Sequence, residues 1–296
     1  MKHIVFYSGG IGSWATAKRV IKKYGKENVI LLFTDTLIED EDLYRFIDDT
    51  VKEMDVEYVK IADGRTPFEV YKDVRFLGNS RIAPCSHKLK QEVADKWIKE
   101  NFKPDECILY LGIDWTEEHR TKAPRKNWHP YQVEFPMCEE PYITKDEMLQ
   151  ELERLGIETP RLYKMGFAHN NCGGFCCRAG QGHFATLLKQ MPERFAHYEV
   201  KEEEIRQFLN KDVSMLKKTK STTVFVEPIA NNIEELDLNN IDEDEREDYI
   251  EKAINGYYKK DKQTYTYTLR QLREDIEAKE KIDMNDIGGC GCFVDE

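Results

Sequence analysis

The chain begins MKHIVFYSGGIGSWATAKRV (residues 1–20), where a glycine-rich segment, SGGIGS (residues 8–13), separates two different patterns. The apolar run HIVFY (residues 3–7) is typical of a buried parallel strand, and the residues after the glycines favour a helix that extends to Tyr24. Backbone N–H groups of such a loop, and of the helix N-terminus, can point at one anion. The segment therefore predicts a phosphate-binding loop.

The same alternation continues through the first half of the chain. Further apolar runs of strand length are NVILLFT (residues 28–34), VEYVKI (56–61) and CILYLGI (107–113), and helical spacing lies between them, over residues 43–54 and 88–101. Strands that alternate with helices favour an α/β fold, a doubly wound and mainly parallel sheet covered on both faces. We expect this sheet to form a first domain over residues 1–140.

The pattern changes after about Pro141. Thr144 is a candidate N-cap for a helix that ends at Gly156, and a Gly/Cys segment follows, NNCGGFCCRAGQGHF (residues 170–184). A charged helical region then extends to about Leu209, before a short β-like segment, TTVFVEP, an acidic run and a last helix near residues 267–281. We expect residues 141–296 to form a mainly helical, Cys-rich module.

Composition and charge exclude several classes of protein. The 296 residues carry a formal net charge of -12, which argues against a broad, sequence-independent grip on nucleic acid. The acid is concentrated in residues 233–252, whereas RIAPCSHKLK (81–90) is locally basic, so a phosphate pocket is compatible with the charge. No apolar run reaches the roughly 20 residues of a membrane span, and no signal-peptide pattern begins the chain, which predicts a cytoplasmic protein.

Three kinds of phosphate loop are candidates for residues 8–13. A dinucleotide fingerprint, G-x-G-x-x-A, is matched by Gly10, Gly12 and Ala15, with Asp35 where a ribose-binding acid belongs. A Walker loop is excluded because no Gly-Lys-Ser/Thr follows. In the third kind, the pyrophosphatase loop S-G-G-x-x-S, serine hydroxyls and glycine amides cradle the β and γ phosphates of ATP.

Four motifs in chain order favour the third kind. Ser8, Gly9, Gly10 and Ser13 resemble the loop of the adenine nucleotide alpha hydrolase superfamily, the N-type ATP pyrophosphatases with a PP-loop fold of the HUP type. Three later segments resemble the phosphoadenylylsulfate reductase-like branch: FTDTLIEDEDLYRF (33–46) its T-D-T-G-x-x-x-x-E-T element, APCSHKLK (83–90) its C-x-x-x-L-K element, and LGIDWTEEHR (111–120) its G-I-R-x-x-E-s-x-x-R element. The resemblance covers about the first 125 residues.

The chain departs from this family at several positions. Gly12 stands where the loop usually has an Asp near metal and phosphates, so Mg²⁺ handling differs or Asp35 takes a larger share. Leu37 stands where the branch has a second Gly. The tail, GGCGCFVDE (288–296), lacks the E-C-G-x-H motif of true sulfonucleotide reductases, which disfavours reduction of a sulfonucleotide.

The resemblance implies ATP and Mg²⁺ as cofactors and attack on the α phosphorus. Fixed donors, a cation and in-line positioning are what such chemistry requires of a protein. We expect four catalytic residues: Ser13, Lys90, Arg120 and Asp35. We expect the nucleotide and Mg²⁺ to be bound by Ser8, Gly9, Gly10, Gly12, Ser13, Lys88, Glu117 and, through the backbone around the adenine, Phe33 and Thr34. The charged residues also have an ordinary interpretation, as surface cations or as acids at strand ends and helix caps.

The cysteines predict a metal site. Eight cysteines without an export signal favour metal binding or catalysis over disulfides. Glycines beside the cysteines allow the tight turns of a closed four-thiolate site, for which our preferred ligands are Cys172, Cys176, Cys290 and Cys292. Cys177 would crowd Cys176 and is left out, and Cys85 is interpreted as structural. Zinc and a [4Fe–4S] cluster both suit four cysteines, and unligated thiols are the alternative.

The resemblance extends to sulfur-inserting relatives, which include the DNA phosphorothioation sulfurtransferase and some tRNA thiolation enzymes and carry iron–sulfur clusters beside the same nucleotide domain. It implies an enzyme that adenylates an acceptor, with DNA and tRNA as candidate acceptors, for sulfur transfer or another substitution, and it suggests a phage or prophage source. The alternatives are a sulfonucleotide enzyme, reductase-like or ATP sulfurylase-like, and a metal-stapled binding protein without turnover. The sequence names neither the acceptor nor the oligomeric state.

Overall fold

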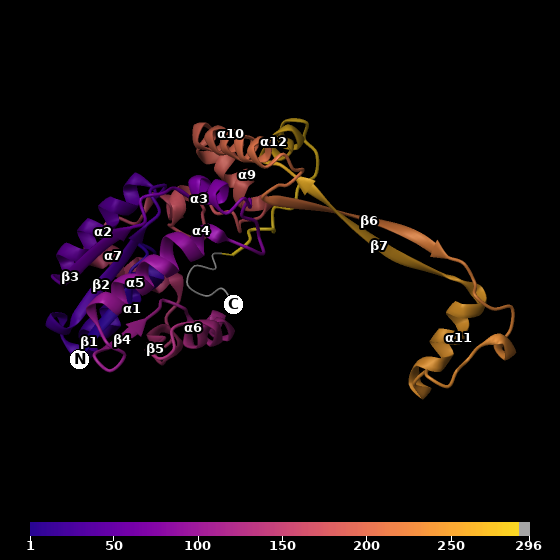
Figure 1. Cartoon of the computed structure of the whole chain (residues 1–296), viewed down its shortest axis with the longest axis horizontal. Coiled ribbons are helices and arrows are strands. Elements are labelled where there is room, and N and C mark those ends of the chain that lie inside the picture. Colours follow the sequence, from indigo (N-terminus) through magenta and orange to yellow (C-terminus); the bar gives the residue numbers. More distant parts are fainter. Residues whose placement is uncertain (290–296) are drawn as a thin grey trace. The chain divides into compact units, whose positions relative to one another are not determined.

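A five-stranded parallel sheet organises the first part of the chain in the computed structural model, which describes residues 1–289 (Figure 1). Its strands are β1 (Lys2–Phe6), β2 (Val29–Asp35), β3 (Glu57–Ala62), β4 (Cys107–Tyr110) and β5 (Gln132–Glu134). They lie in the order β3-β2-β1-β4-β5, and every neighbouring pair is parallel. The chain thus winds outward from β1 on one side and crosses to β4 on the other, which confirms the predicted doubly wound sheet.

Side chains of each strand alternate between the two faces of the sheet, so both faces carry apolar residues and both are covered by other elements. One cluster of buried residues joins Val5, Leu31 and Phe33 to three helices: α1 (Ile11–Tyr24), α2 (Glu41–Met54) and α7 (Lys145–Arg154). The opposite cluster joins Ile4 and Leu32 to α5 (Glu92–Asn101) and to the chain around β5. The helix expected after Thr144 is confirmed as α7, and the Thr144 and Glu147 side chains form a capping box at its start.

A third core is helical. It joins α9 (Gln181–Gln190), α10 (Pro192–Leu209) and α12 (Leu269–Glu277) to Phe68 and Tyr71 of α3 (Pro67–Asp73). This core therefore includes four buried residues from before residue 140: Phe68, Tyr71, Leu77 and Ala83. The remaining short helices are η1 (Lys26–Asn28), α4 (Pro84–Ser86), the π-helical η2 (His87–Gln91), η3 (Trp115–Thr121), α6 (Lys122–Asn127), η4 (Pro136–Cys138), α8 (Arg161–Lys164), η5 (Cys172–Gly174), η6 (Ile233–Glu235) and η7 (Glu243–Glu245).

The chain divides into two compact units by its contacts. The first is Met1–Leu216 with the described residues from Tyr267 on, and the second is Lys217–Thr266. All three cores lie in the first unit, and this division does not fall at residue 140, so the expected boundary there stays a prediction. No helix among residues 1–289 is both long and apolar enough to cross a membrane.

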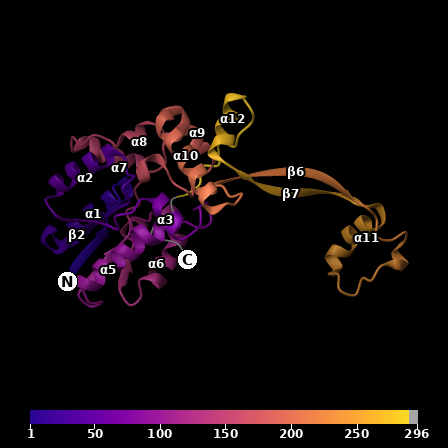
Figure 2. The same ribbon diagram turned by 45° about the horizontal axis from the view of Figure 1, so that its top comes forward.

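The second unit is built on a two-stranded ribbon. Strands β6 (Leu216–Val226) and β7 (Tyr257–Tyr267) run beside each other, and α11 (Arg246–Asn255) lies at the end of the ribbon that carries the connection between them (Figures 1 and 2). We expected only a short β segment here and missed β7. Both strands are mostly exposed and lack the apolar alternation that marks a half-buried strand.

Candidate functional site

The glycine loop connects β1 to α1 at the carboxyl edge of the sheet. Gly9 has a φ of 73°, which favours glycine, and Gly10 is the residue that precedes the helix. The Ser13 hydroxyl donates to the Gly10 carbonyl at 2.8 Å and accepts from the Ser8 hydroxyl at 3.4 Å. The two serines that match the family loop are therefore adjacent.

A cleft of about 220 Å³ lies beside this loop. The strand order reverses between β1 and β4, and the cleft is lined by residues that follow both strands, which is where doubly wound sheets bind ligands. Its lining residues are Phe6, Ser8, Gly10, Ile11, Gly12, Ser13, Leu111, Gly112, Ile113, Asp114, Glu117, Arg120, Lys145, Met148, Tyr163, Ala168, His169 and Asn171.

Two glycines touch across this cleft. A Cβ atom added to Gly112 would lie 2.9 Å from the Gly12 carbonyl carbon and 2.9 Å from the Ser13 nitrogen. A Cβ atom added to Gly12 would lie 3.3 Å from the Gly112 carbonyl oxygen. The backbone after β4 therefore packs directly on the start of α1.

Residues from the second half of the chain complete the cleft, and we did not predict them. The Tyr163 hydroxyl accepts a hydrogen bond from the Ile11 amide at 3.0 Å, at the N-terminus of α1. Lys145 Nζ lies 4.2 Å from the centre of the Tyr163 ring and donates to the Ala168 carbonyl at 2.9 Å. Burial lowers the pKa of Lys145. Asn170 also contacts the loop, because its side-chain amide donates to the Gly9 carbonyl at 2.9 Å.

Of the four expected catalytic residues, the structure brings two to the cleft. Ser13 and Arg120 line it, together with Glu117, which forms a close ion pair with Arg120. Of the other residues expected to bind the nucleotide, Ser8, Gly10 and Gly12 line the cleft, whereas Gly9 does not. Phe33 and Thr34 are buried and are not among the lining residues either.

Asp35 lies at the end of β2 and is not among the residues that line the cleft. Its carboxylate accepts hydrogen bonds from the Tyr44 hydroxyl and the Leu37 amide, both at 2.8 Å, and pairs with Lys60 at 2.8 Å. Asp35 has the position that the sequence predicts, yet these partners already hold its side chain. A catalytic role for Asp35 stays a prediction.

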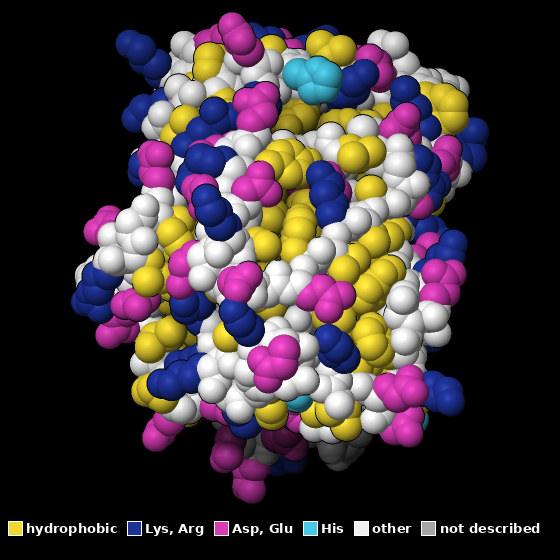
Figure 3. Space-filling view, turned by 90° about the vertical axis from the view of Figure 1, so that its left-hand side faces the viewer, with side chains coloured by type: hydrophobic (Ala, Val, Ile, Leu, Met, Phe, Trp, Pro, Cys, Tyr) yellow, Lys and Arg dark blue, Asp and Glu magenta, His cyan; other side chains and the backbone are white. Residues whose placement is uncertain are grey.

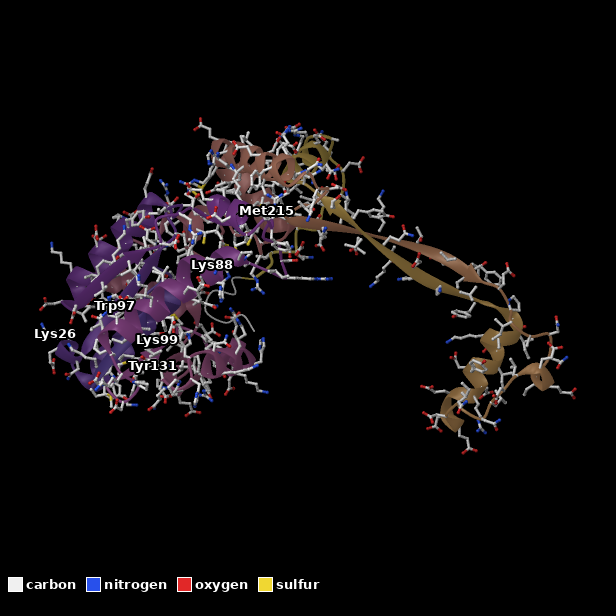
Figure 4. The ribbon with its side chains drawn as sticks, in the orientation of Figure 1. Lys26, Lys88, Trp97, Lys99, Tyr131 and Met215 are labelled. Atoms are coloured by element: carbon white, nitrogen blue, oxygen red, sulfur yellow. The ribbon has the colours of Figure 1, made fainter. Side chains whose placement is uncertain are left out.

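The two expected lysines lie elsewhere on the helical run that includes η2. Lys88, labelled in Figure 4 together with Trp97 and Lys99 of α5, pairs with Glu92 at 2.6 Å and does not line the cleft. Lys90 is buried, and its Nζ lies 3.9 Å from the Cys172 sulfur. The structure therefore places Lys90 beside the cysteines, and Lys90 is not among the residues that line the cleft.

The cysteines of both halves meet around a second, small cavity. Its lining includes Cys85, Cys172, Cys176 and Cys177, along with Lys90. The sulfur atoms of Cys85 and Cys177 are 3.8 Å apart, and the Tyr71 hydroxyl donates to the Cys85 sulfur at 3.2 Å. The hydrogen bond with Cys85 and burial both raise the pKa of Cys177. Cys85 and Cys177, which we left out of the predicted site, are thus part of the cysteine cluster.

A buried carboxylate ties the cysteine segment to the loop after β2. Asp40 is fully buried and accepts hydrogen bonds from Arg161 at 2.9 Å and from Arg194 at 2.6 Å, and Arg194 also donates to the Gly173 carbonyl at 2.8 Å. Burial alone would raise the pKa of Asp40, but the two guanidinium groups hold it below its usual range. The adjacent Glu39 carboxylate accepts a hydrogen bond from the Cys172 amide.

Two of the four predicted metal ligands, Cys290 and Cys292, lie outside the described residues. The described tail nevertheless pairs with the cysteine segment, because Gly288 forms an antiparallel bridge with Ala179 and the Gly180 amide donates to the Ile287 carbonyl at 3.1 Å. Within residues 1–289, no three His, Cys, Asp or Glu side chains form a group that could hold a metal ion. The donor set, thiols beside glycines, suits zinc or an iron–sulfur cluster.

No protein-family model and no curated protein matches the chain. Similar solved structures include a phosphoadenylyl-sulfate (PAPS) reductase from Candida auris in complex with phosphate, at 13% identity and a TM-score of 0.38, over 56% of this chain and 79% of that chain. The U34-tRNA thiolase NcsA from Methanococcus maripaludis, with its [4Fe-4S] cluster, is 17% identical with a TM-score of 0.41, over 71% and 73%. An NH3-dependent NAD synthetase from Campylobacter jejuni subsp. jejuni NCTC 11168, in complex with the nitrate ion, is 12% identical with a TM-score of 0.36, over 71% and 84%. At these identities and TM-scores, the similarity does not bear on activity.

Proposed function

We propose that this chain is an ATP pyrophosphatase-type enzyme, which cleaves ATP between the α and β phosphates and transfers AMP to an acceptor. The observation that carries the proposal is the cleft at which the loop serines, Arg120 and Lys145 converge. Hydroxyl and amide donors with two cations suit a triphosphate, because charge-assisted hydrogen bonds to phosphate oxygens are the stronger ones. The acceptor we propose is a nucleic acid or a nucleotide, on which a sulfur nucleophile then displaces AMP.

The residues of the cleft have distinct roles in this proposal. An oxygen of the acceptor attacks the α phosphorus while the bond to the bridging oxygen breaks, and pyrophosphate leaves with the electron pair. Ser8, Ser13 and the loop amides hold the phosphate oxygens in line for this displacement. Arg120 and Lys145 stabilise the negative charge that builds on them. Mg²⁺ would further neutralise the phosphates, and Glu117 is our candidate to hold it.

We further propose that the cysteine segment holds zinc or a [4Fe–4S] cluster through Cys172, Cys176, Cys290 and Cys292. The pairing of Ala179 with Gly288 supports this, because Cys176 and Cys290 lie within three residues of that bridge in the sequence. Either group would cross-link the tail to the middle of the chain. Lys90, beside Cys172, would then act on the chemistry of this sulfur and not on ATP.

A second candidate function is nucleotide binding without turnover. It is favoured by Gly12, which stands where similar loops carry an acid near metal and phosphates and which packs closely against Gly112. The third candidate function is that of a sulfonucleotide enzyme, either reductase-like or ATP sulfurylase-like. Release of sulfite from a sulfonucleotide would support it.

The test is the turnover of ATP labelled at the α phosphate, with Mg²⁺ and with DNA or tRNA as acceptor, resolved for AMP and ADP. We expect AMP and pyrophosphate from the wild-type chain, and at least a tenfold loss in Ser13→Ala and Lys145→Ala. Lys96→Ala is the matched control, because Lys96 is exposed on α5 and does not line the cleft. ADP as the product would overturn the proposal. ATP binding without any product would favour the binding protein.

A further inference from the structure

The second unit, Lys217–Thr266, has almost no core of its own. Among its residues only two apolar side chains are buried, Ala230 and Ala253. Seven large apolar side chains are exposed: Val224, Phe225, Ile229, Ile233, Tyr257, Tyr258 and Tyr265. A two-stranded ribbon is at best marginally stable alone in water, and exposed apolar clusters mark interaction sites. These observations point to a protein partner for this unit.

The charge of the unit is separated along its length. The stem, residues 216–226 and 257–267, has six lysines and one acid, Asp261. The tip, residues 227–256, has eleven acids and two bases. By contrast, the face of the first unit in Figure 3 shows Lys and Arg side chains interspersed with Asp and Glu. A surface that is basic at one end and acidic at the other is complementary in charge to a second copy that lies antiparallel to it.

Five of the seven exposed apolar side chains lie within three residues of the boundary between stem and tip: Val224, Phe225, Ile229, Tyr257 and Tyr258. The rings of Phe225 and Tyr258 lie 5.1 Å apart at the tip end of the ribbon. Tyr258 is 74% exposed, and Ile229, shortly after β6, is 70% exposed. An antiparallel pair of such units would bring these two apolar junctions together at its centre and place each stem beside the opposite tip.

We propose that Lys217–Thr266 is a dimerisation arm that binds the same arm of a second copy of this chain. Each basic stem lies against the acidic tip of the other copy, and the apolar junctions pack at the two-fold axis. This is an isologous contact, in which one self-complementary surface serves both partners, and it closes at two copies. The inference is independent of the proposed ATP chemistry, because it concerns residues outside the cleft.

Duplex DNA is the other partner that six lysines suggest. Eleven residues of β-strand span roughly 36 Å, about one turn of the double helix. Two observations argue against DNA. The eleven acids of the tip repel phosphates, and a phosphate backbone would not bury the exposed side chains of Ile229 and Ile233. A second copy satisfies both the charge and the apolar surface.

The experiment measures the dimer dissociation constant of the full chain by sedimentation, at about 50 mM and about 500 mM NaCl. One variant reverses the stem, with Lys259→Glu, Lys260→Glu and Lys262→Glu. A second reduces the negative charge of the tip, with Glu243→Lys, Asp244→Lys and Glu247→Lys. The control reverses three exposed lysines of the first unit, Lys96→Glu, Lys99→Glu and Lys103→Glu, which changes the net charge by the same amount as the stem variant.

We expect a wild-type dimer that weakens at high salt, and at least a tenfold rise in the dissociation constant for the stem and the tip variant separately. In an equimolar mixture, the unchanged stem of the tip variant can meet the unchanged tip of the stem variant, so a heterodimer with one wild-type contact should form more tightly than the homodimer of the stem variant. The control should dimerise as the wild type does. Circular dichroism verifies that each variant is folded.

Three results would overturn the proposal. The first is a wild-type chain that stays monomeric at low salt; if stem reversal then abolishes its binding to a duplex of about 20 base pairs, the partner is DNA. The second is a dimer whose dissociation constant rises in neither the stem variant nor the tip variant, because its interface would then lie outside the second unit. The third is a mixture of the two variants that dimerises no more tightly than the stem variant alone, since the contact between an unchanged stem and an unchanged tip would then contribute nothing.

Discussion

At the scale of single residues, the tightest constraint in the site is the contact between Gly12 and Gly112. We predict that Gly112→Ala lowers the free energy of unfolding by about 1–3 kcal/mol, because the new methyl group would meet the backbone of the loop at 2.9 Å. Urea unfolding measures this, and ATP binding should weaken in the same variant because the loop must shift.

The control for Gly112→Ala is Gly289→Ala. Among residues 1–289, no atom lies within 4 Å of a Cβ atom added to Gly289, and Gly289 has no positive φ, so its substitution should change neither stability nor ATP binding. Equal stability of the Gly112→Ala and Gly289→Ala variants would show that the contact between the two glycines is looser than described.

A second residue-scale prediction concerns Glu202 of α10. Burial raises its pKa to about 7, although the Met215 and Leu269 amides donate to its two carboxylate oxygens at 2.9 and 2.6 Å. An unfolded Glu has a pKa near 4.5, so the folded chain holds an extra proton between about pH 4.5 and 7. The contribution of Glu202 to stability is therefore full below that window and is lost as the pH rises through it.

The change amounts to roughly 3 kcal/mol across the window at most. We expect the free energy of unfolding of the wild type to fall between pH 5 and pH 8 relative to that of Glu202→Gln, which cannot ionise. Urea unfolding of both chains at each pH measures the difference. A difference that does not change with pH would mean that Glu202 has an ordinary pKa.

At the scale of elements, the Asp40 carboxylate links the start of α2 to the cysteine segment. We predict that Asp40→Ala destabilises the chain by about 3–5 kcal/mol, because it leaves Arg161 and Arg194 without their shared partner. The double variant Asp40→Ala/Arg194→Ala should cost less than the sum of the single ones, since the interaction is removed once. Additive costs in urea unfolding would show that Arg194 does not depend on Asp40.

The elements also show where periodicity helps and where it does not. Strands β1 to β4 were predictable because they are apolar runs bounded by polar turns, and α7 was predictable because Thr144 caps it. Strand β5, with only three residues, was not predicted. Strand β7 was not, because YYKKDKQTYTY (residues 257–267) pairs with β6 without burying either face. Its one signal was the density of Tyr and Thr, which favour strands.

At the scale of the whole molecule, the predicted metal site includes Cys290 and Cys292, which lie outside the residues that the structure describes. If Cys290 is a ligand, Cys290→Ser should lower the zinc or iron content of anaerobically purified protein, whereas Cys85→Ser should not. Cys107→Ser is the control, because Cys107 is buried in β4 among residues of the sheet core. The opposite result for Cys290 and Cys85 would assign the site to the cysteines around the described cavity.

The sequence by itself determined four of the five strands of the parallel sheet, the glycine loop and the capped helix that follows Thr144, because these depend on residues close together in the chain. It also identified Ser13, Arg120 and Glu117, which lie in motifs beside strands of the sheet. Only the tertiary structure decided that Lys145 and Tyr163 reach the loop and that Lys90 turns to Cys172. The physical reason is that such neighbours are fixed by packing between distant segments, and no local periodicity records that packing.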